Sequence, residues 1–425
     1  MTTLAITRRA ADRLRAGHLW VYRSDIEQPE ETLGPGVLVT IIDSRKIPLG
    51  TALYSTTSQI AARLISRTPG LTREQYLVGV RERISSALTI RRELAPITAA
   101  NNAHRLIFAE ADNLPGIIAD RYNDLVLLQL LTQGTAQEDV RKIVVDALCA
   151  KLSPGNQPLT IWERPDPRIR ELEQLPAAAT GPLFTNTSSS EATATTTFTL
   201  NGLRFHYDAS AGQKTGAFLD QRLNYEAAAR HVSATGRSNR ALDVCTYQGG
   251  FALHLARICS QVTGVDQSRV ALEAAERNLT LNPNLRAAVD WIEADAFTLL
   301  RALDDATRDP SSAASLPLAP GSFDAIVLDP PAFAKSKRAA EGAVRGYKEL
   351  NLRAIRLLAP GGTLITCSCS HHVSLADFTE AVGAAAADAG RRVQLLETRA
   401  AAADHPEILT LPETRYLKCL ICRVD

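Results

Sequence analysis

The feature of this chain that most constrains its fold is a regular alternation of strand-like and helix-like segments from Asn239 onward. Short apolar runs predict five strands, at residues 241–245, 261–265, 288–292, 325–328 and 363–366. Helices are predicted between or after them, at residues 251–259, 269–281, 296–303 and 344–358. Strands and helices that alternate in this way are typical of an α/β fold, so we expect a doubly wound parallel sheet over residues 201–425.

The first 200 residues show a different organisation. Closely spaced turn signals, such as Gly34-Pro35-Gly36, predict a small β-barrel over residues 1–70. From Thr72 to Leu94, apolar residues recur at helical spacing and predict one amphipathic helix. This helix opens an α+β middle region over residues 71–200. Its further elements are expected at 105–108, 126–131 and 160–162 for strands and at 138–152 for a helix.

Two stretches rich in small and polar residues are predicted to lack regular structure. Residues 176–199, with a Ser/Thr-rich run, are expected to form a poorly packed connector at the end of the middle region. Residues 304–322 are expected to loop out between a helix and the next strand.

Charge and cysteine content limit which binding partners and which cellular compartment we expect. Lys and Arg number 47 against 46 Asp and Glu, so RNA binding would have to rest on a local basic surface. Seven scattered cysteines fit a reducing compartment better than a disulfide framework. The sequence shows no secretory signal and no apolar run of membrane-spanning length. We therefore expect a cytoplasmic protein without membrane contact.

The first predicted strand of the α/β region leads into a glycine-containing turn. Asp243 stands at the strand end, and Gly249 and Gly250 precede the next helix. Glycines allow the backbone to approach a ligand closely at such a turn. The pattern is not Gly-x-Gly-x-x-Gly, and it suits a ligand with an amino-acid tail better than a pyrophosphate.

Acidic residues also end the next two predicted strands. Asp266 can accept hydrogen bonds from ribose hydroxyls, and Asp295, followed by Ala296, can accept one from an adenine amino group. Either acid alone could simply cap the following helix. Three acids at successive strand ends are harder to explain as caps, and together they predict S-adenosylmethionine. A dinucleotide such as NAD remains the alternative, although its glycine fingerprint is missing.

Two further strand ends carry groups suited to chemistry on a base. Asp329-Pro330-Pro331 follows one strand, and Cys367 and Cys369 lie at the end of another. A cysteine thiolate can add to carbon 6 of cytosine, activate carbon 5 for methylation, and leave afterwards. Asp329 could hold the exocyclic amine or assist proton transfer. Residues i and i+2 of a strand share one face, so spacing does not choose between the two cysteines.

Other interpretations of the two cysteines remain open. Most free cysteines are buried packing residues. Cys367 and Cys369 with His371 and His372 also suggest zinc, although the spacing is unusual for a zinc site and Cys419 and Cys422 are distant in sequence. We expect no metal.

At this point the chain resembles a known family, the bacterial 23S rRNA cytosine-5 methyltransferases that carry an N-terminal PUA domain. The resemblance rests on motifs along nearly the whole chain: Gly17 to Tyr22, Asp112 to Gly116, Asp120 to Tyr122, Gly212 to Arg222, Asp329 to Phe333, Arg345 to Asn351, Leu357 to Gly362, Ser368-Cys369-Ser370, Ala403 to Pro406 and Tyr416 to Lys418. It implies a PUA barrel, an α+β middle domain and a Rossmann-like class I methyltransferase domain. It also implies that Cys369 is the nucleophile and that Cys367 is an additional cysteine.

The resemblance implies further site residues and partners. It adds Asp220, Gln221 and Arg222 to the cofactor site, beside Asp329. The substrate would be 23S rRNA or a large-subunit assembly intermediate, and a homodimer is one assembly left open. Two departures stand out: Ala332 occupies a position where a lysine is expected, and the stretch around residues 185–197 resembles an insertion. The family has no second cysteine beside the Asp-Pro-Pro loop, so the group that removes the carbon-5 proton is unassigned.

A target base in structured RNA must be unstacked and turned into the site. Side chains around the diproline loop are expected to contact it or the adjacent phosphates: Pro330, Pro331, Phe333, Lys335, Arg345 and Tyr347. Phe333 or Tyr347 would stack on the base. A solvated basic loop is the simpler explanation for any one of the charged residues.

Three functions compete. The leading one is an rRNA cytosine-5 methyltransferase. A related enzyme acting on guanine N7 shares the Asp-Pro-Pro-x-Phe loop and needs no thiol. The third is an RNA-binding assembly factor without turnover, against which the complete set of acids and Cys369 argues.

Overall fold

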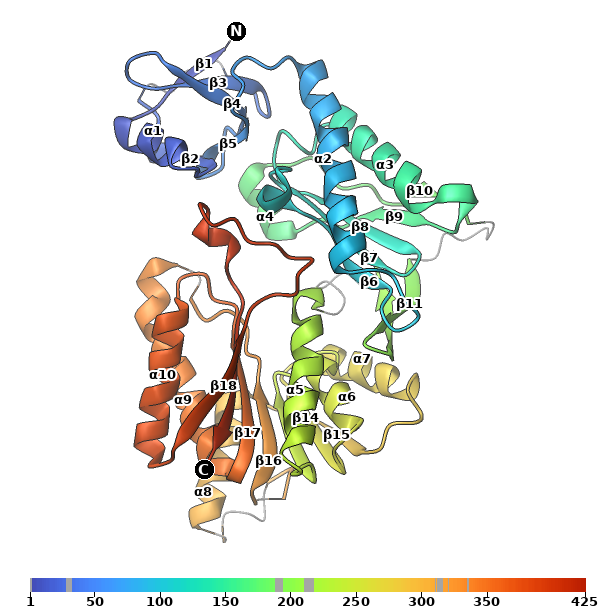
Figure 1. Ribbon diagram of the computed structural model, residues 1–425, viewed down its shortest axis with the longest axis vertical. Helices are drawn as coiled ribbons and strands as arrows, with labels where there is room; N and C mark the ends of the chain where they lie inside the picture. The colour runs from blue at the N-terminus through green and yellow to red at the C-terminus, as the bar shows by residue number, and fades with distance from the viewer. Residues whose placement is uncertain are drawn as a thin grey trace. The chain divides into compact units, whose positions relative to one another are not determined.

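The computed structural model describes residues 2–27, 33–187, 194–209, 218–309, 311, 316–319, 321–334 and 336–425. The chain forms two compact units. The first takes residues 1–198, 207–214 and 403–414, and the second takes residues 199–206, 215–402 and 415–425. The chain therefore passes between the units several times, and Ala403–Thr414, near its end, belongs to the first unit (Figure 1).

The N-terminal part of the first unit is a five-stranded half-barrel. Its strand order is β1-β3-β4-β5-β2, with bounds β1 Thr3–Ala5, β2 Trp20–Tyr22, β3 Leu38–Ile42, β4 Pro48–Tyr54 and β5 Ile60–Ser66. Helix α1 (Arg8–Arg15) begins after Thr7, whose hydroxyl accepts a hydrogen bond from the Ala10 amide at 3.3 Å. Apolar residues of α1 and the strands, including Leu4, Leu14 and Ile41, form one buried core. The predicted small β-barrel is thus confirmed in this half-barrel form.

The rest of the first unit is a second five-stranded sheet with helices. Its strand order is β10-β9-β8-β7-β6, with bounds β6 Ala103–Phe108, β7 Ile117–Tyr122, β8 Leu125–Leu130, β9 Thr160–Glu163 and β10 Phe184–Thr185. Helices α2 (Arg73–Leu94) and α3 (Glu138–Leu152) pack into the same core, and the short helix α4 spans Pro167–Glu173. Helix α2 begins where the sequence predicts, because Thr72 and Gln75 form a reciprocal capping box.

The predicted connector over residues 176–199 is wrong in part. Strand β10 lies within it, and strand β11 (Thr195–Leu200) pairs with β12 (Leu203–Asp208) in a two-stranded hairpin. Asn201 and Gly202 turn this hairpin with positive φ angles of 51° and 83°, as a tight hairpin turn requires. Phe198 is fully buried, so apolar packing holds β11 in place. The Ser/Thr-rich residues 188–193 lie outside the described residues.

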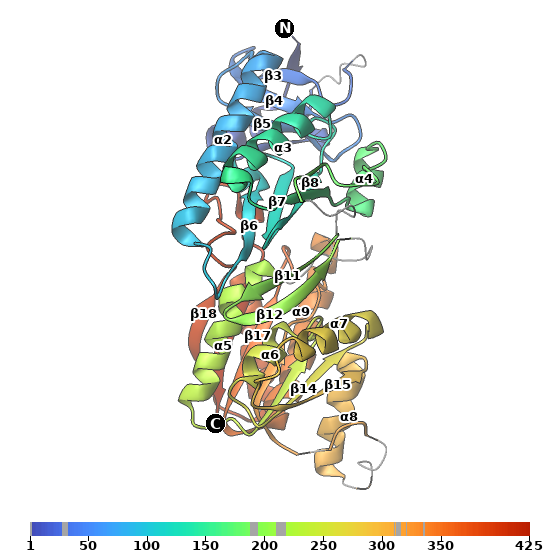
Figure 2. The same cartoon turned by 90° about the vertical axis from the view of Figure 1, so that its right-hand side faces the viewer.

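The second unit contains a seven-stranded sheet of order β15-β14-β13-β16-β17-β19-β18 (Figures 1 and 2). The strands are β13 Arg240–Val244, β14 Gln261–Asp266, β15 Ala288–Glu293, β16 Phe323–Leu328, β17 Leu358–Ser368, β18 Val393–Arg399 and β19 Lys418–Val424. The helices are α5 Arg222–Ala234, α6 Gly250–Ala256, α7 Arg269–Thr280, α8 Ala296–Arg308, α9 Ala340–Leu357 and α10 Leu375–Ala389. Helices α5 and α6 pack on one face of the sheet, and α8, α9 and α10 pack on the other.

The α/β prediction is confirmed, but the sheet is not wholly parallel. The five predicted strands are parallel neighbours, whereas β19 runs antiparallel to both β17 and β18. The connection is consistent with this reversal: no α-helix of the described chain lies between β18 and β19, and an antiparallel partner needs no crossover helix. Helix α8 runs to Arg308, so the predicted loop over residues 304–322 begins later than expected, and residues 310, 312–315 and 320 of it are not described.

Short 3-10 helices occur at η1 Arg23–Asp25, η2 Ala109–Asp112, η3 Pro154–Asn156, η4 Leu219–Gln221, η6 Lys337–Ala339 and η7 Pro412–Thr414. Among the residues that the structure describes, no helix combines the length and apolar character needed to cross a membrane. The same residues contain no group of three or more His, Cys, Asp or Glu side chains that could hold a metal ion.

Candidate functional site

The candidate site lies in the second unit, at the carboxyl ends of its parallel strands. Strand β13 is paired with β14 on one side and with β16 on the other, so chain order reverses there. Ligands of open α/β sheets bind at such a switch point. The Asp329 amide, just past β16, donates to the Val244 carbonyl at the end of β13 (3.2 Å) and joins the two strand ends. The predicted acids and Cys369 therefore follow neighbouring strands.

The loop between β13 and α6 has an unusual backbone. Cys245, Tyr247 and Gly249 have positive φ angles of 65°, 52° and 81°, the first two being uncommon for side-chain-bearing residues. Gly250 cannot gain a side chain without strain, because a Cβ there would lie 2.5 Å from the Tyr225 ring. The loop is thus held tightly over the core, with backbone strain at the place where the sequence predicts a ligand.

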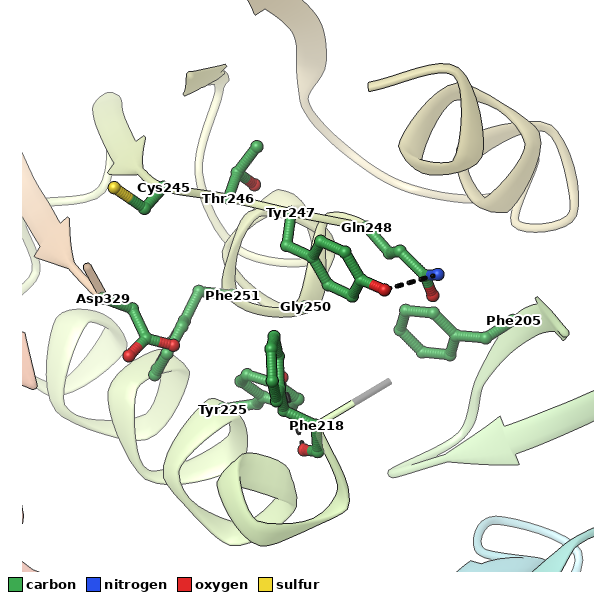
Figure 3. Close-up of a pocket in the computed structure, with 10 residues that line it drawn as sticks. All are labelled: Phe205, Phe218, Tyr225, Cys245, Thr246, Tyr247, Gln248, Gly250, Phe251 and Asp329. Carbon is green, nitrogen blue, oxygen red and sulfur yellow. Dashed lines mark hydrogen bonds between the residues drawn. The ribbon is translucent and has the colours of Figure 1, made fainter. Parts of the chain in front are cut away.

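Ten residues line a pocket beside this loop (Figure 3): Phe205, Phe218, Tyr225, Cys245, Thr246, Tyr247, Gln248, Gly250, Phe251 and Asp329. Cys245 and Asp329 lie on one side of the view, and Phe205 and Gln248 lie on the other. The Phe218 and Tyr247 rings pack at a centroid distance of 5.1 Å. The pocket combines aromatic walls with one acidic end.

Asp243 is fully buried at the end of β13. Its Oδ2 accepts hydrogen bonds from the Thr246 hydroxyl (2.6 Å) and the Ala252 amide (2.9 Å). Its Oδ1 is buried and has no hydrogen-bond partner among the described residues. Burial raises the pKa of Asp243 to about 7. A buried carboxylate oxygen that accepts no hydrogen bond from the protein fits a site in which the bound ligand donates that hydrogen bond.

Asp266 and Asp295 are placed differently from each other. Asp266 organises the loops, since its Oδ2 accepts from the Tyr247 amide (3.0 Å) and its Oδ1 from the Ser268 amide (2.9 Å). Asp295 is exposed and caps α8, with Oδ1 accepting from the amide and the hydroxyl of Thr298 at 2.9 and 2.8 Å. The capping alternative for Asp295 is therefore correct, whether or not it also contacts a ligand. Ala296, the first residue of α8, packs against the apolar core.

Asp220, Gln221 and Arg222 lie where η4 meets α5. The Gln221 amide donates to Asp329 Oδ1 at 3.0 Å, which connects this segment to the Asp-Pro-Pro loop. Asp220 Oδ2 accepts from the Tyr416 hydroxyl at 2.5 Å, whereas its Oδ1 is buried without a hydrogen-bond partner in the described part of the chain. Arg222 is buried. Residues 212–217 of this predicted motif lie outside the described residues.

Asp329 joins an acidic cluster. Burial raises its pKa to about 8, helped by the charges of Asp220 and Asp243 and opposed by the Gln221 hydrogen bond. The carboxyl is therefore largely protonated near neutral pH when no cation is bound. A positively charged ligand bound beside these acids would stabilise their ionised form. S-adenosylmethionine carries a sulfonium and an ammonium group, so the residues present fit it.

The structure separates the two cysteines that sequence spacing could not. Cys367 is fully buried in β17, directly opposite Cys419 of β19, and packs in the core. Strand β17 ends at Ser368, so Cys369 leaves the sheet and is only half-buried. Its thiol donates a weak hydrogen bond to the Pro330 carbonyl, with an S–O distance of 3.9 Å. Of these two cysteines, Cys369 is the one whose sulfur lies beside the Asp-Pro-Pro loop.

The predicted substrate-binding residues differ in accessibility. Pro330 is buried, Pro331 is exposed and Phe333 is half-buried. Arg345 is exposed and pairs with Glu341 at 2.8 Å. Lys335 lies outside the described residues.

The stacking role predicted for Tyr347 does not agree with its burial, because only 1% of the residue is exposed. Its hydroxyl lies 2.9 Å from the Ser370 hydroxyl, and its ring packs on Phe333 and Phe378 at centroid distances of 4.8 and 5.1 Å. Tyr347 therefore packs against Phe333 and contacts Ser370 in the loop that carries Cys369.

Sequence reasoning missed several residues of this region. Phe218 lies within the predicted motif Gly212 to Arg222 but was given no role there, although it could have been found from that motif. Phe205 lies on the unrecognised hairpin strand β12. Trp291 packs against Gly264, where a Cβ would lie 2.4 Å from its ring, and no local pattern predicts that contact. Lys418 belongs to the motif Tyr416 to Lys418 but received no role from the sequence; 49 residues after Cys369, it reaches the same loop only because β19 pairs with β17.

Comparisons with known proteins point to the same cofactor as the geometry of the site. A family model of a PUA-like domain matches residues 4–67, and one of S-adenosylmethionine-dependent methyltransferases matches residues 184–411. The chain is similar to the ribosomal RNA large subunit methyltransferase I of Klebsiella pneumoniae (strain 342), with 35% identity over 96% of this chain and 94% of the relative. The protein of that name from Pseudoalteromonas translucida is also 35% identical, over 100% of both chains.

Solved structures show the same fold at lower sequence identity. The methyltransferase SMU.776, described in complex with SAH, has a TM-score of 0.78 at 19% identity, over 100% of both chains. A structure described as a SAM-dependent methyltransferase from Streptococcus mutans has a TM-score of 0.77, also at 19% identity and full coverage.

Proposed function

Because the chain belongs to the ribosomal RNA large subunit methyltransferase I family of PUA-domain, S-adenosylmethionine-dependent methyltransferases, we propose that it makes 5-methylcytosine in 23S rRNA through a covalent cysteine adduct. The observation that carries the proposal is the position of Cys369. It is the half-buried cysteine that meets Pro330 of the Asp-Pro-Pro loop at the switch point of the sheet.

Cys369 acts as the nucleophile in this mechanism. Its thiolate forms a bond to carbon 6 of the cytosine, and the electron pair of the 5,6 double bond moves to carbon 5. The cofactor, when bound, would supply a methyl group on a positively charged sulfur; as carbon 5 bonds to the methyl carbon, the sulfur–methyl bond would break and the sulfur would keep the electron pair as a neutral thioether. Loss of the carbon-5 proton to a base then restores the double bond and expels the Cys369 thiolate.

Asp329 would contact the polar edge of the cytosine. In its protonated form it can donate a hydrogen bond to ring nitrogen 3, which makes carbon 6 more electrophilic. In its ionised form it can accept from the exocyclic amine. The raised pKa of about 8 keeps both forms accessible near neutral pH.

The cofactor would lie along the ends of β13, β14 and β15. Asp243, Asp220, Gln221 and Arg222 would form or support the site of its amino-acid part, with Gly249 and Gly250 allowing close backbone approach. We assign Asp266 to the ribose, and Asp295 with Ala296 to the adenine. The buried oxygens of Asp220 and Asp243 without a partner in the described chain support this arrangement.

Contacts to RNA would come from residues beside the diproline loop and from the first unit. Pro331 and Phe333 would face the flipped base, and Lys335 and Arg345 would contact phosphates. The half-barrel would bind RNA outside the target nucleotide. The partner is thus 23S rRNA or an assembly intermediate that contains it, which places the enzyme in the cytoplasm.

A methyl-transfer assay on unmodified 23S rRNA tests the proposal, with product nucleosides identified by mass spectrometry. We expect 5-methylcytosine from wild type. Cys369→Ala should lower the rate by more than about a thousandfold, as loss of a nucleophile does in other enzymes. Cys367→Ala is the matched control and should stay active, because Cys367 lies in the core.

If Cys369→Ala remains active, the covalent mechanism is wrong. A methylated guanine as product would identify the guanine-N7 alternative. Binding of RNA without any methylated product would leave the assembly-factor alternative.

A further inference from the structure

Lys418 is a buried basic residue for which the mechanism above has no role. It is the first residue of β19 and stands opposite Ser368, the last residue of β17. Only 5% of the residue is exposed. It forms no ion pair with a carboxylate anywhere in the described part of the chain. A buried ammonium group without a counter-ion is costly, so its burial here calls for a reason.

The ammonium group is held at the loop that carries Cys369. Its Nζ donates to the Ser370 carbonyl at 2.7 Å and to the Tyr416 carbonyl at 2.8 Å. The first of these carbonyls belongs to the residue directly after Cys369, and the second to the segment that precedes β19. Lys418 thus ties the nucleophile's loop to the neighbouring strand.

The other charges around Cys369 oppose its ionisation. Burial is the largest cause that raises the pKa of this thiol, and the Asp329 and Asp220 carboxylates raise it too, whereas the Lys418 charge lowers it; the result is a pKa of about 12. Burial in turn lowers the pKa of Lys418 to about 8, and the charge of Cys369 raises it. Each charge therefore favours the ionised form of the other, as expected for a thiolate–ammonium pair.

We propose that Lys418 is a positioning residue of the nucleophile: its ammonium group fixes the Cys369 loop and stabilises the Cys369 thiolate. The step concerned is the ionisation of the thiol. The S–H bond breaks, the proton passes to solvent, the sulfur keeps the electron pair, and Lys418 keeps its own protons. The inference deepens the proposed function, since it takes Cys369 as the nucleophile, but thiol ionisation can be measured without methyl transfer.

The test compares iodoacetamide alkylation of Cys369 in the full-length chain and in two variants, measured on the Cys369 peptide by mass spectrometry. Lys418→Gln keeps an amide that can donate to both carbonyls but removes the charge. Lys418→Arg keeps the charge. Cys149 is the internal control, because it is half-buried on α3 of the first unit.

We expect Lys418→Gln to lower the alkylation rate of Cys369 at pH 7, where Lys418 is charged, by about tenfold, which corresponds to one pKa unit. Lys418→Arg should stay within about threefold of wild type on the same scale, and Cys149 should react equally in all three. Equal Cys369 rates in wild type and Lys418→Gln would overturn the proposal. An equal decrease in both variants would show that shape, not charge, matters, and would also overturn it.

The wild-type chain provides a second test in case the variants do not fold. Lys418, with its pKa of about 8, loses its charge as the pH rises from 8 to 10. The Cys369 rate should then rise clearly less than the tenfold per pH unit expected of an isolated thiol, whereas Cys149 should follow the tenfold rule. A tenfold rise at both cysteines would contradict a stabilising charge on Lys418. Activity of Cys369→Ala would refute the covalent mechanism and leave these alkylation results unaffected.

Discussion

At the scale of single residues, the site is defined by groups whose ionisation is shifted by their surroundings. Asp243 and Asp329 have pKa values raised to about 7 and about 8, in both cases chiefly by burial. Shifts of this size are typical of functional sites, since they keep groups near the point where protons can be exchanged. In the cofactor-free protein they also carry a cost in stability.

The pH dependence of stability tests the Asp329 shift. Because the folded-state pKa lies above the unfolded value of 3.8, the stability that the neutral carboxyl confers is present below pH 4 and is lost as pH rises through 8. Each pKa unit corresponds to about 1.4 kcal/mol, so the loss between pH 5.5 and 8.5 is on the order of a few kcal/mol. The unfolding free energy of Asp329→Asn should decrease less over this interval.

Urea unfolding of both cofactor-free proteins at the two pH values measures this difference. The two proteins share all other titrating groups, so the difference between their changes in unfolding free energy over this pH interval reports on Asp329. Equal changes would show that Asp329 ionises as freely as in the unfolded chain.

At the scale of elements, one buried ion pair joins three segments of the first unit. Arg91 near the end of α2 donates to both carboxylate oxygens of Asp112 at 2.5 and 2.7 Å, and to the Asp404 carbonyl at 3.1 Å. Asp404 Oδ2 in turn accepts from the Arg105 amide at the start of the middle sheet (2.9 Å). The segment Ala403–Thr414 is therefore held in the first unit by hydrogen bonds from Arg91 and Arg105 to Asp404.

We expect Arg91→Met to destabilise the first unit by about 3–5 kcal/mol, because it leaves the buried Asp112 carboxylate without its partner. The adjacent Arg92→Met is the matched control. Arg92 is exposed in the same turn, so its replacement should change stability by no more than about 0.5 kcal/mol. Chemical denaturation measures both, and equal effects would refute a stabilising role of the ion pair.

At the scale of the whole molecule, the two units are not consecutive pieces of sequence. Ala403–Thr414 returns to the first unit after almost all of the second has been completed. A fragment that ends before this segment lacks the acceptors that Asp404 offers to Arg91 and Arg105. The first unit is thus completed only when the chain is nearly at its end.

We predict that a fragment of residues 1–209 unfolds at lower urea concentration than the first unit within the full chain. Trp291→Phe in the full chain makes this comparison direct, since the two remaining tryptophans, Trp20 and Trp162, both lie in the first unit. Coincident fluorescence transitions in the fragment and the full chain would show that residues 403–414 do not stabilise that unit.

The sequence by itself determined what short-range patterns encode. Apolar runs, caps and turn residues act over a few positions, so the five parallel strands, the start of α2 at Thr72 and the acids at strand ends could be predicted. The α/β class, S-adenosylmethionine and the enzyme class are confirmed. The short strands β7 and β10 and the hairpin of β11 and β12 were missed, because their local sequence signals are weak.

Only the tertiary structure decided which of these residues share one environment. Cys367 and Cys369 look equivalent in sequence, yet one packs in the core and the other meets Pro330, because β17 ends between them. Tyr347 looks like a stacking residue but is buried under Phe333. Lys418 comes beside Cys369 through the pairing of β19 with β17. Burial, and with it the ionisation of these groups, depends on what the rest of the fold places around them, which no local pattern records.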